Sequence, residues 1–160
     1  MSRLEQAIAA HEQRLMLHVD ELPKLADGIY LLSRPALLER VDAERAFIAR
    51  TLLTHLWVVE TTIHCHLDRT SACTRTLERL RAEHHVIRGL AARLDEIATR
   101  RPLEPADVNE LDAVLTALYL RLRAHLREES RCLLILEGSL SVGEIDALAS
   151  AMDEAYVSAA

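Results

Sequence analysis

The chain has 160 residues, of which half are hydrophobic and only 3% are aromatic, and this length suits one domain with a real hydrophobic core. The formal net charge of −6 argues against a nucleic-acid partner, because phosphate binding needs a basic face. No apolar run has the length of a membrane span, no signal-peptide pattern opens the chain, and 3 cysteines make no disulfide framework, so we expect a cytoplasmic protein. The high content of Leu, Ala, Arg and Glu predicts an all-α fold.

The first predicted helix covers residues 4–31. One seven-residue row of this helix carries Leu4, His11, His18 and Leu25. Pro23 lies inside the predicted span, and a proline in a helix interior removes a backbone hydrogen bond and clashes with the preceding turn. We therefore expect a kink or a break near this residue.

The second predicted helix begins after a turn at residues 33–35 and continues to about His66. Its apolar face combines aliphatic residues with two histidines and a threonine: Val41, Ile48, Leu52, His55, Val59, Thr62 and His66. The stretch at residues 68–71 breaks this pattern and ends the helix.

The third and fourth predicted helices flank a loop at residues 101–105, which contains two prolines. The apolar face of the third helix carries Leu77, Leu80, His84, Ile87, Ala91 and Leu94. The corresponding row of the fourth helix carries Leu111, Leu115, Leu118, Leu122, His125, Glu129, Cys132 and Leu136. The fourth helix therefore points two ionisable side chains, His125 and Glu129, at its own core.

The end of the chain predicts one more helix. Gly138 suits the C-terminal cap of the fourth helix, and Ser141 with Glu144 resembles a capping box that opens a short last helix, which ends near Tyr156. Four long helices with short connections pack most simply as an up-down-up-down four-helix bundle. The sequence thus predicts an all-α single domain over residues 1–160, with a short C-terminal fifth helix.

Each long predicted helix places at least one histidine on its apolar row: His11 and His18, then His55, then His84, then His125. Glu129 adds a carboxylate one turn beyond His125, and residues four apart lie about 6 Å apart along the axis, nearly on one face. An unpaired carboxylate in an apolar interior costs several kcal/mol, against a total stability of about 5–15 kcal/mol. One core histidine is ordinary, but this set favours a metal, and imidazole with carboxylate suits iron, manganese or zinc.

Three motifs match a known family in their order along the chain. His125 and Glu129 form a His-x-x-x-Glu pair in the fourth helix, Glu83-His84 precedes an apolar run in the third, and His11 precedes Leu15 in the first. With these motifs, residues 4–137 resemble the hemerythrin-like family, the HHE cation-binding domain. The resemblance implies a non-haem di-iron centre between four helices, with two Fe per chain and oxygen as the external ligand.

The resemblance also implies metal ligands from all four helices. In chain order these are His11, with His18 as a second candidate two turns on, His55, His84, His125 and Glu129. Glu129 would be the bridging carboxylate.

The chain departs from the family pattern at two positions. The family's second helix has a His-x-x-x-Glu motif, but here Val59 occupies the place of the bridging glutamate and Glu60 follows it. Glu60 lies about 100° further around the helix, so it either lines a wall or reaches the metal where this helix is rotated or bulged. Hemerythrins proper have a second histidine four residues after the first in the third helix, where this chain has Arg88. A modified di-iron site, a mononuclear site and a lost site all stay open.

The resemblance implies a protein that binds or senses oxygen, or a related small molecule such as nitric oxide or peroxide. An iron-dependent enzyme that consumes peroxide or oxygen is one alternative, because a missing bridge leaves more coordination positions open. A degenerate bundle that is metal-free, or that binds haem through two core histidines, is another. The oligomeric state stays open.

A second group of metal-binding residue types lies at the end of the second predicted helix: His64, Cys65, His66, Asp68 and Cys73. Such residues can hold zinc, but their spacing matches no standard zinc motif, and histidines at helix ends are often solvated. We therefore expect a solvated helix end here rather than a zinc site. His66 also lies on the core row, but about 16 Å along the axis from His55, too far to share its metal.

Overall fold

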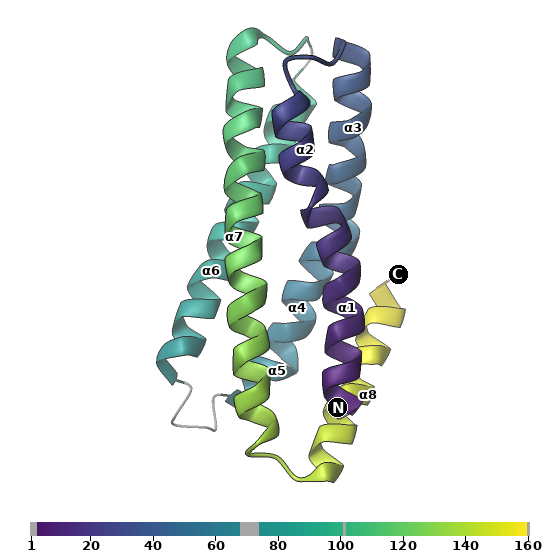
Figure 1. Cartoon of the computed structure of the whole chain (residues 1–160), viewed down its shortest axis with the longest axis vertical. Coiled ribbons are helices and arrows are strands. Elements are labelled where there is room, and N and C mark those ends of the chain that lie inside the picture. Colours follow the sequence, from purple (N-terminus) through teal and green to yellow (C-terminus); the bar gives the residue numbers. More distant parts are fainter. Residues whose placement is uncertain (1–2, 68–73, 101, 160) are drawn as a thin grey trace.

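The computed structural model describes residues 3–67, 74–100 and 102–159, and every regular element in these ranges is a helix (Figure 1). The elements in chain order are α1 Arg3–Val19, α2 Glu21–Gly28, α3 Arg34–Phe47, η1 Ile48–Leu52, α4 Leu53–Thr61, α5 Ile63–Leu67, α6 Thr74–Thr99, α7 Pro105–Glu137 and α8 Val142–Ala159. The prediction of an all-α protein is confirmed. Among the helices in these ranges, none is both long and apolar enough to cross a lipid bilayer.

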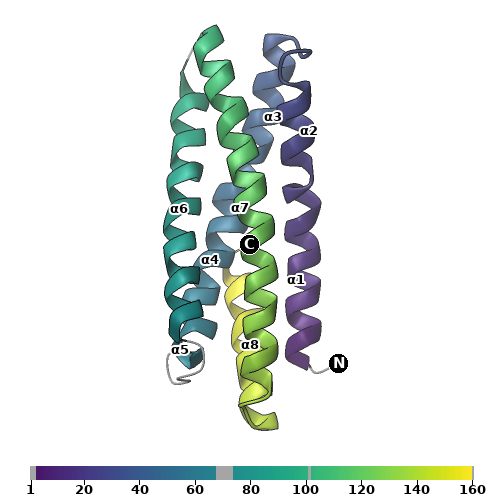
Figure 2. The ribbon, with the colours of Figure 1, turned by 60° about the vertical axis from the view of Figure 1, so that its left-hand side comes forward.

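The helices are grouped into rods that run along one long axis (Figures 1 and 2). One rod is made of α1 and α2, a second of α3, η1, α4 and α5, and the other two are α6 and α7. α6 and α7 pack side by side, and α7 also packs against both α1 and α2. α6 contacts α3, α4 and α5, which closes the bundle around a common interior.

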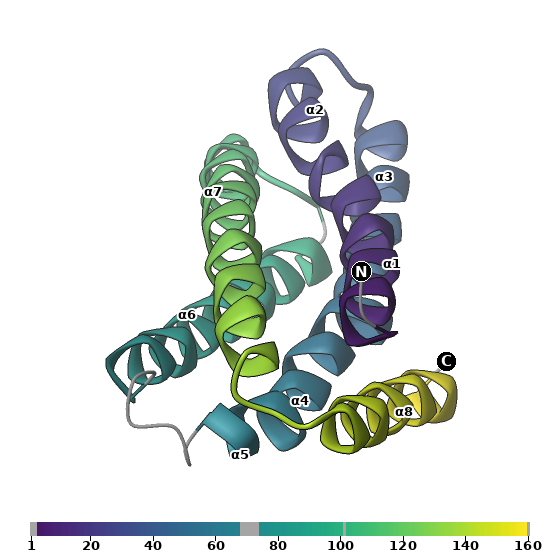
Figure 3. The same ribbon diagram turned by 60° about the horizontal axis from the view of Figure 1, so that its bottom comes forward.

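α8 lies outside these rods, against α1 and α4 (Figure 3). The predicted capping box opens this helix, because Ser141 N–H donates to Glu144 Oε2 at 2.9 Å and Glu144 N–H donates to Ser141 Oγ at 3.4 Å. The helix has 18 residues, so it is longer than the short last helix that we predicted. Its buried Leu148, Ala149 and Met152 extend the apolar face that packs on the bundle, which supports the extra length.

The predicted break in the first rod is confirmed. α1 ends at Val19 and α2 begins at Glu21, so the helix is interrupted at Asp20, three residues before Pro23. Pro23 has no N–H to donate to Val19 O, and its ring would clash with that carbonyl in a continuous helix. The break therefore lies one turn before the proline, next to Val19, whose carbonyl would accept the hydrogen bond that Pro23 cannot donate.

The second rod contains a π-helical segment, η1, that we did not predict. Leu53 N–H donates to Ile48 O, five residues back, instead of the four residues of an α-helix. Such a π-turn inserts one residue into the helical register, and π-turns are frequent at functional sites. η1 ends one turn before His55.

Thr62 interrupts the same rod between α4 and α5. Thr62 Oγ1 donates to Val58 O at 2.7 Å, and Thr61 Oγ1 lies 2.9 Å from Trp57 O and 3.2 Å from Val58 O. Threonine side chains that bond back to carbonyls one turn earlier bend helices. The two adjacent threonines therefore explain why the long predicted helix ends here and restarts at Ile63.

This interruption changes the buried face of the rod. Ile63 and His64 are buried after it, whereas Thr62 and His66 are only partly buried. The prediction that His66 lies on the core row is therefore wrong, and so is the expectation that His64 belongs to a solvated helix end. Both predictions assumed that one helical phase continues through residues 61 and 62.

The buried apolar residues form two clusters with buried polar side chains between them. The first apolar cluster includes Leu15, Leu52, Ile87 and Leu122, and the second includes Ile8, Val59, Leu80 and Cys132. Between these residues, each rod carries buried polar side chains, which are His11, His55, His64, His84, His125 and Glu129. We call these six residues the polar layer.

Candidate metal centre

Five of the predicted metal ligands lie in the polar layer: His11 from α1, His55 from α4, His84 from α6, and His125 and Glu129 from α7. Each of these side chains is at most 5% exposed. The helical period explains this burial, because each residue continues an apolar row of its own helix. The prediction that these five residues face the interior is confirmed.

The tightest group in the layer joins His55, His125 and Glu129. Glu129 Oε2 lies 3.1 Å from His55 Nε2 and 3.4 Å from His125 Nε2. One ligand atom of each of the three side chains lies within 4.8 Å of the other two. His125 and Glu129 share a face of α7 because they are four residues apart, and His55 meets them from α4. Three such donors around one point can hold an ion of the iron or zinc class.

Glu129 is ionised although it is buried. Burial favours the neutral acid and is the largest single influence, but the charges of His55 and His125 and the hydrogen bonds from their rings together outweigh it and hold the pKa of Glu129 well below its ordinary value. Without such partners, burial would raise the pKa of a carboxyl group and keep it neutral. The group therefore combines an anionic oxygen with imidazole nitrogens.

His84 extends this group from α6 toward Glu60. His84 Nε2 lies 3.0 Å from His125 Nε2, and His84 Nδ1 lies 2.7 Å from Glu60 Oε1. Glu60 also accepts two hydrogen bonds from the Arg88 guanidinium, at 2.9 and 2.7 Å. An ionised carboxylate only accepts, so the neutral His84 ring carries its proton on Nδ1 and has a lone pair on Nε2. Glu60 thereby selects the tautomer of His84 whose lone pair faces the layer.

The charges of Glu60 and His84 fit this arrangement. Burial raises the pKa of Glu60, but the hydrogen bonds from Arg88 and His84 outweigh it and lower that pKa to about 2. The pKa of His84 falls to about 4, mainly through burial and then through the charge of His125, against the opposing pull of Glu60. At neutral pH, Glu60 is therefore ionised and His84 is neutral, and the neutral imidazole is the form that binds metal ions.

His11 joins the layer from α1. Its ring stacks on that of His55, with centroids 4.9 Å apart and an angle of 21° between the planes. Burial, together with the nearby charges of His55 and Arg14, lowers the pKa of His11 to about 3. His11 is therefore also neutral at pH 7.

His64, from α5, is the one layer residue that we did not predict as a ligand. Its side chain is 1% exposed, and its ring stacks on that of His84 with centroids 5.1 Å apart. Among the described residues, neither ring nitrogen of His64 has a hydrogen-bond partner. Its pKa falls to about 4, mainly because of burial. The sequence signal for this inward turn was the Thr61-Thr62 pair, whose side chains compete with the helical backbone.

His18 lies outside the layer. Its side chain is exposed, and its ring stacks on that of Phe47 of α3, with centroids 4.1 Å apart. The buried residues of α1 follow the series Leu4, Ile8, His11, Leu15 and Val19. This series departs from the seven-residue row because a straight α-helix drifts by about 20° per heptad. The structure therefore places His18, the second candidate ligand, outside the polar layer.

The departures from the family pattern at residues 59 and 60 have different consequences. Val59 is buried in the second apolar cluster, so position 59 brings no carboxylate to the layer. Glu60 lies beside His84 and Arg88 rather than beside Glu129. η1 precedes Val59 and Glu60 and shifts both together, so the bulge does not move Glu60 into the place of Val59. The structure shows Glu60, which we predicted as a possible direct ligand, as a hydrogen-bond partner of a layer histidine.

The residues considered for a zinc site do not converge over the part of the chain that the structure describes. His64 is buried, Cys65 is exposed, and His66 Nδ1 lies 2.8 Å from Thr62 O. Asp68 and Cys73 lie outside the described residues.

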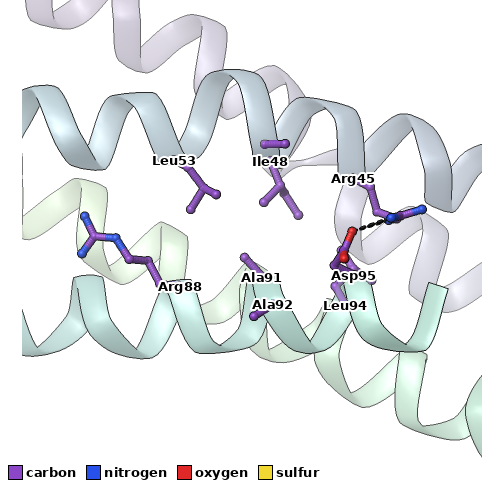
Figure 4. A pocket seen from close by; sticks show the side chains of 9 residues that line it. Arg45, Ile48, Leu53, Arg88, Ala91, Ala92, Leu94 and Asp95 are labelled. Carbon is purple, nitrogen blue, oxygen red and sulfur yellow. Dashed lines mark hydrogen bonds and ion pairs between the residues drawn. The ribbon is translucent and has the colours of Figure 1, made fainter. Parts of the chain in front are cut away.

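A groove of about 390 Å³ lies between η1 and α6. It is lined by Arg45, Ile48, Ala49, Leu53, Arg88, Ala91, Ala92, Leu94 and Asp95. Figure 4 shows Ile48 and Leu53 facing Ala91 and Ala92, while Arg45 pairs with Asp95 at 3.0 Å. Arg88 belongs both to this groove and to the hydrogen-bond chain through Glu60 to His84. The lining contains none of the six layer residues, so the groove is separate from the candidate metal centre.

Comparisons with known protein families, with curated proteins and with solved structures found no match for this chain.

Proposed function

We propose that this chain is a hemerythrin-like, up-down-up-down four-helix bundle that holds non-haem iron, two ions per chain, in its polar layer. Its function would be to bind or sense oxygen, or a related small molecule such as nitric oxide or peroxide. The observation that carries this proposal is the convergence of His55, His125 and Glu129, of which one ligand atom each lies within 4.8 Å of the other two.

The chemistry of the layer fits iron. Imidazole nitrogen and carboxylate oxygen are ligands that suit iron in bundle cores, and here His11, His84 and His64 are neutral while Glu129 is ionised. His11, His55, His84, His125 and Glu129 are the residues that would hold it. Bound iron would supply a coordination position that is open to a small ligand.

The rest of the bundle supports this use of the layer. The two apolar clusters on either side keep bulk water away from the histidines, which strengthens electrostatic interactions within the layer. Glu60 holds the proton of His84 on Nδ1, so that Nε2 is ready to donate its lone pair.

Two other functions have an observation in their favour. Val59 leaves the centre with one fewer carboxylate than the family pattern, which favours an iron-dependent enzyme that turns over peroxide or oxygen at the additional open positions. The hydrogen bonds among His55, Glu129, His125 and His84 favour a metal-free bundle in which these groups satisfy one another.

The experiment is to express the full chain in iron-supplemented cells, purify it without an affinity tag, and measure iron per chain by plasma mass spectrometry. Two irons per chain, with a visible absorption change that reverses when oxygen is removed, would support the proposed carrier or sensor. Iron-dependent consumption of peroxide would support the enzyme instead. A folded protein without iron would support the metal-free bundle and overturn the proposal.

His18→Ala is the matched control for the site. It removes a histidine from the same rod as His11, but from outside the layer, so the iron content should not change. His11→Ala should lower it.

A further inference from the structure

His64 is a buried histidine whose surroundings do not explain why a histidine is there. Its side chain is 1% exposed, and among the described residues both of its ring nitrogens are without a hydrogen-bond partner. Burying a polar group without a hydrogen bond costs free energy, and an apolar side chain of similar size would avoid that cost. The stack on His84 gives the face of the His64 ring a packing contact, but it gives the ring nitrogens no hydrogen-bond partner.

The position of His64 in the bundle is specific. α5 packs against both α6 and α7, the two helices that carry His84 and His125. His84 Nε2 and His125 Nε2 lie 3.0 Å apart, and both rings meet in the layer with centroids 4.6 Å apart. His64 adds a third imidazole to this pair, because its ring centroid lies 5.1 Å from that of His84.

α6 itself offers a single imidazole to the layer. One turn after His84 the chain has Arg88, and its guanidinium is turned to Glu60 and holds both carboxylate oxygens. Arg88 is permanently positive and has no lone pair for a metal. The second imidazole on this side of the layer comes from another element, because the ring of His64 from α5 stacks on that of His84.

We infer that His64, His84 and His125 form a second metal position, next to the one formed by His11 and His55, with Glu129 shared between them, so that the group of His55, His125 and Glu129 spans both positions. This inference rests on the proposed function, and it names His64 as a ligand of the same centre. The centre is then asymmetric, because one position has three imidazoles and the other has two, while the Glu129 carboxylate belongs to both. Glu129 Oε2 lies 3.1 Å from His55 Nε2 and 3.4 Å from His125 Nε2, which places the shared carboxylate at the boundary of the two positions.

The test compares the wild-type chain with His64→Leu, and the matched control is His66→Leu in the same short helix. Each protein is prepared metal-free and then loaded with iron(II) without oxygen. Iron per chain is measured by mass spectrometry, and the melting temperature is measured with and without iron. We expect two irons in the wild type and in the control, and one in His64→Leu.

The metal-free melting temperature separates a ligand from a structural residue. We expect metal-free His64→Leu to melt above the wild type, because leucine removes two unsatisfied nitrogens, and to gain less from added iron. Two irons retained by His64→Leu would overturn this inference and leave the proposed function intact. Loss of both irons together in a folded His64→Leu would overturn the assignment of two separable positions. A wild type that binds no iron would remove the proposed function and the inference together.

Discussion

Glu129 of α7 and His55 of α4 meet at the centre of the bundle, with Glu129 Oε2 3.1 Å from His55 Nε2 and both side chains buried. The two residues are 74 positions apart in the chain, so their contact requires that α4 and α7 face each other at this level. An ionised carboxylate is stable in such a place because imidazoles on both sides favour its charged form.

Glu129→Ala should remove most of the bound iron, and His125→Ala should do the same, because each change deletes a donor of the tightest ligand group. Plasma mass spectrometry of iron-loaded protein measures the effect. Glu128→Ala is the control, since Glu128 pairs with Arg79 outside the layer. Normal iron content in both ligand variants would exclude α7 from the metal site.

Glu60→Ala should weaken metal binding by about 10–100-fold without abolishing it, because His84 loses the acceptor that holds its proton on Nδ1. Arg88→Ala should have a smaller effect in the same direction, because Arg88 acts on His84 only through Glu60. Titration against a chelator of known affinity measures both changes. The exposed Glu78→Ala on α6 is the control, and an affinity for Glu60→Ala equal to that of this control would contradict the role of Glu60.

Glu44 of α3 should contribute less to the stability of the protein as the pH rises. Burial is the main cause that raises the pKa of Glu44 to about 7, the charge of Glu21 adds to it, and Arg40 opposes it. The folded state therefore holds this proton more tightly than the unfolded chain, and stability falls as the pH rises from the unfolded pKa toward 7. The buried histidines His11, His64 and His84 contribute in the opposite direction, so Glu44→Gln should be compared with the wild type at each pH: it should gain stability relative to the wild type between pH 5 and pH 8, by about 1–3 kcal/mol.

Urea unfolding of the metal-free protein at several pH values tests the Glu44 prediction. Glu39→Gln on the exposed face of α3 is the control and should keep the slope of the wild type. A Glu44→Gln variant with an unchanged slope between pH 5 and pH 8 would show that another group causes it.

The double variant Thr61→Ala, Thr62→Ala should straighten the second rod, because it removes the side-chain bonds to the carbonyls of Trp57 and Val58. The helical phase of α4 would then continue through residues 62–66, so that the side chain of His64 would point toward solvent and that of His66 toward the core. A histidine-specific acylating reagent with mass spectrometry measures this change. In the wild type His64 should be protected and the exposed His85 labelled, whereas in the variant His64 should be labelled. Protection of His64 in both proteins would mean that packing, not the threonines, sets its orientation.

Much of the candidate site was predictable from the sequence, for a local reason. His11, His55, His84, His125 and Glu129 each continue an apolar row with the period of an α-helix, and all five are buried. That period is a property of each helix alone, so it is readable without knowing how the helices pack. The same holds for the break before Pro23 and for the capping box at Ser141, since both depend on atoms within one turn.

The inward turn of His64 and the partners of Glu60 were not predicted, because they depend on where a helical phase is interrupted and on which side chains meet between rods. His64 turns inward, and His66 does not, because the bonds of Thr61 and Thr62 end the phase of α4. Glu60 meets His84 and Arg88 because α4 and α6 are neighbours in space.

The sequence by itself therefore determined the helices and their inward faces, because hydrophobic burial imposes the helical period on each row. The tertiary structure decided which of the inward groups share one point, because that depends on the rotation and translation of each rod. The packing of the two apolar clusters sets both. His55, His125 and Glu129 are the outcome, three donors from two rods within 4.8 Å of one another.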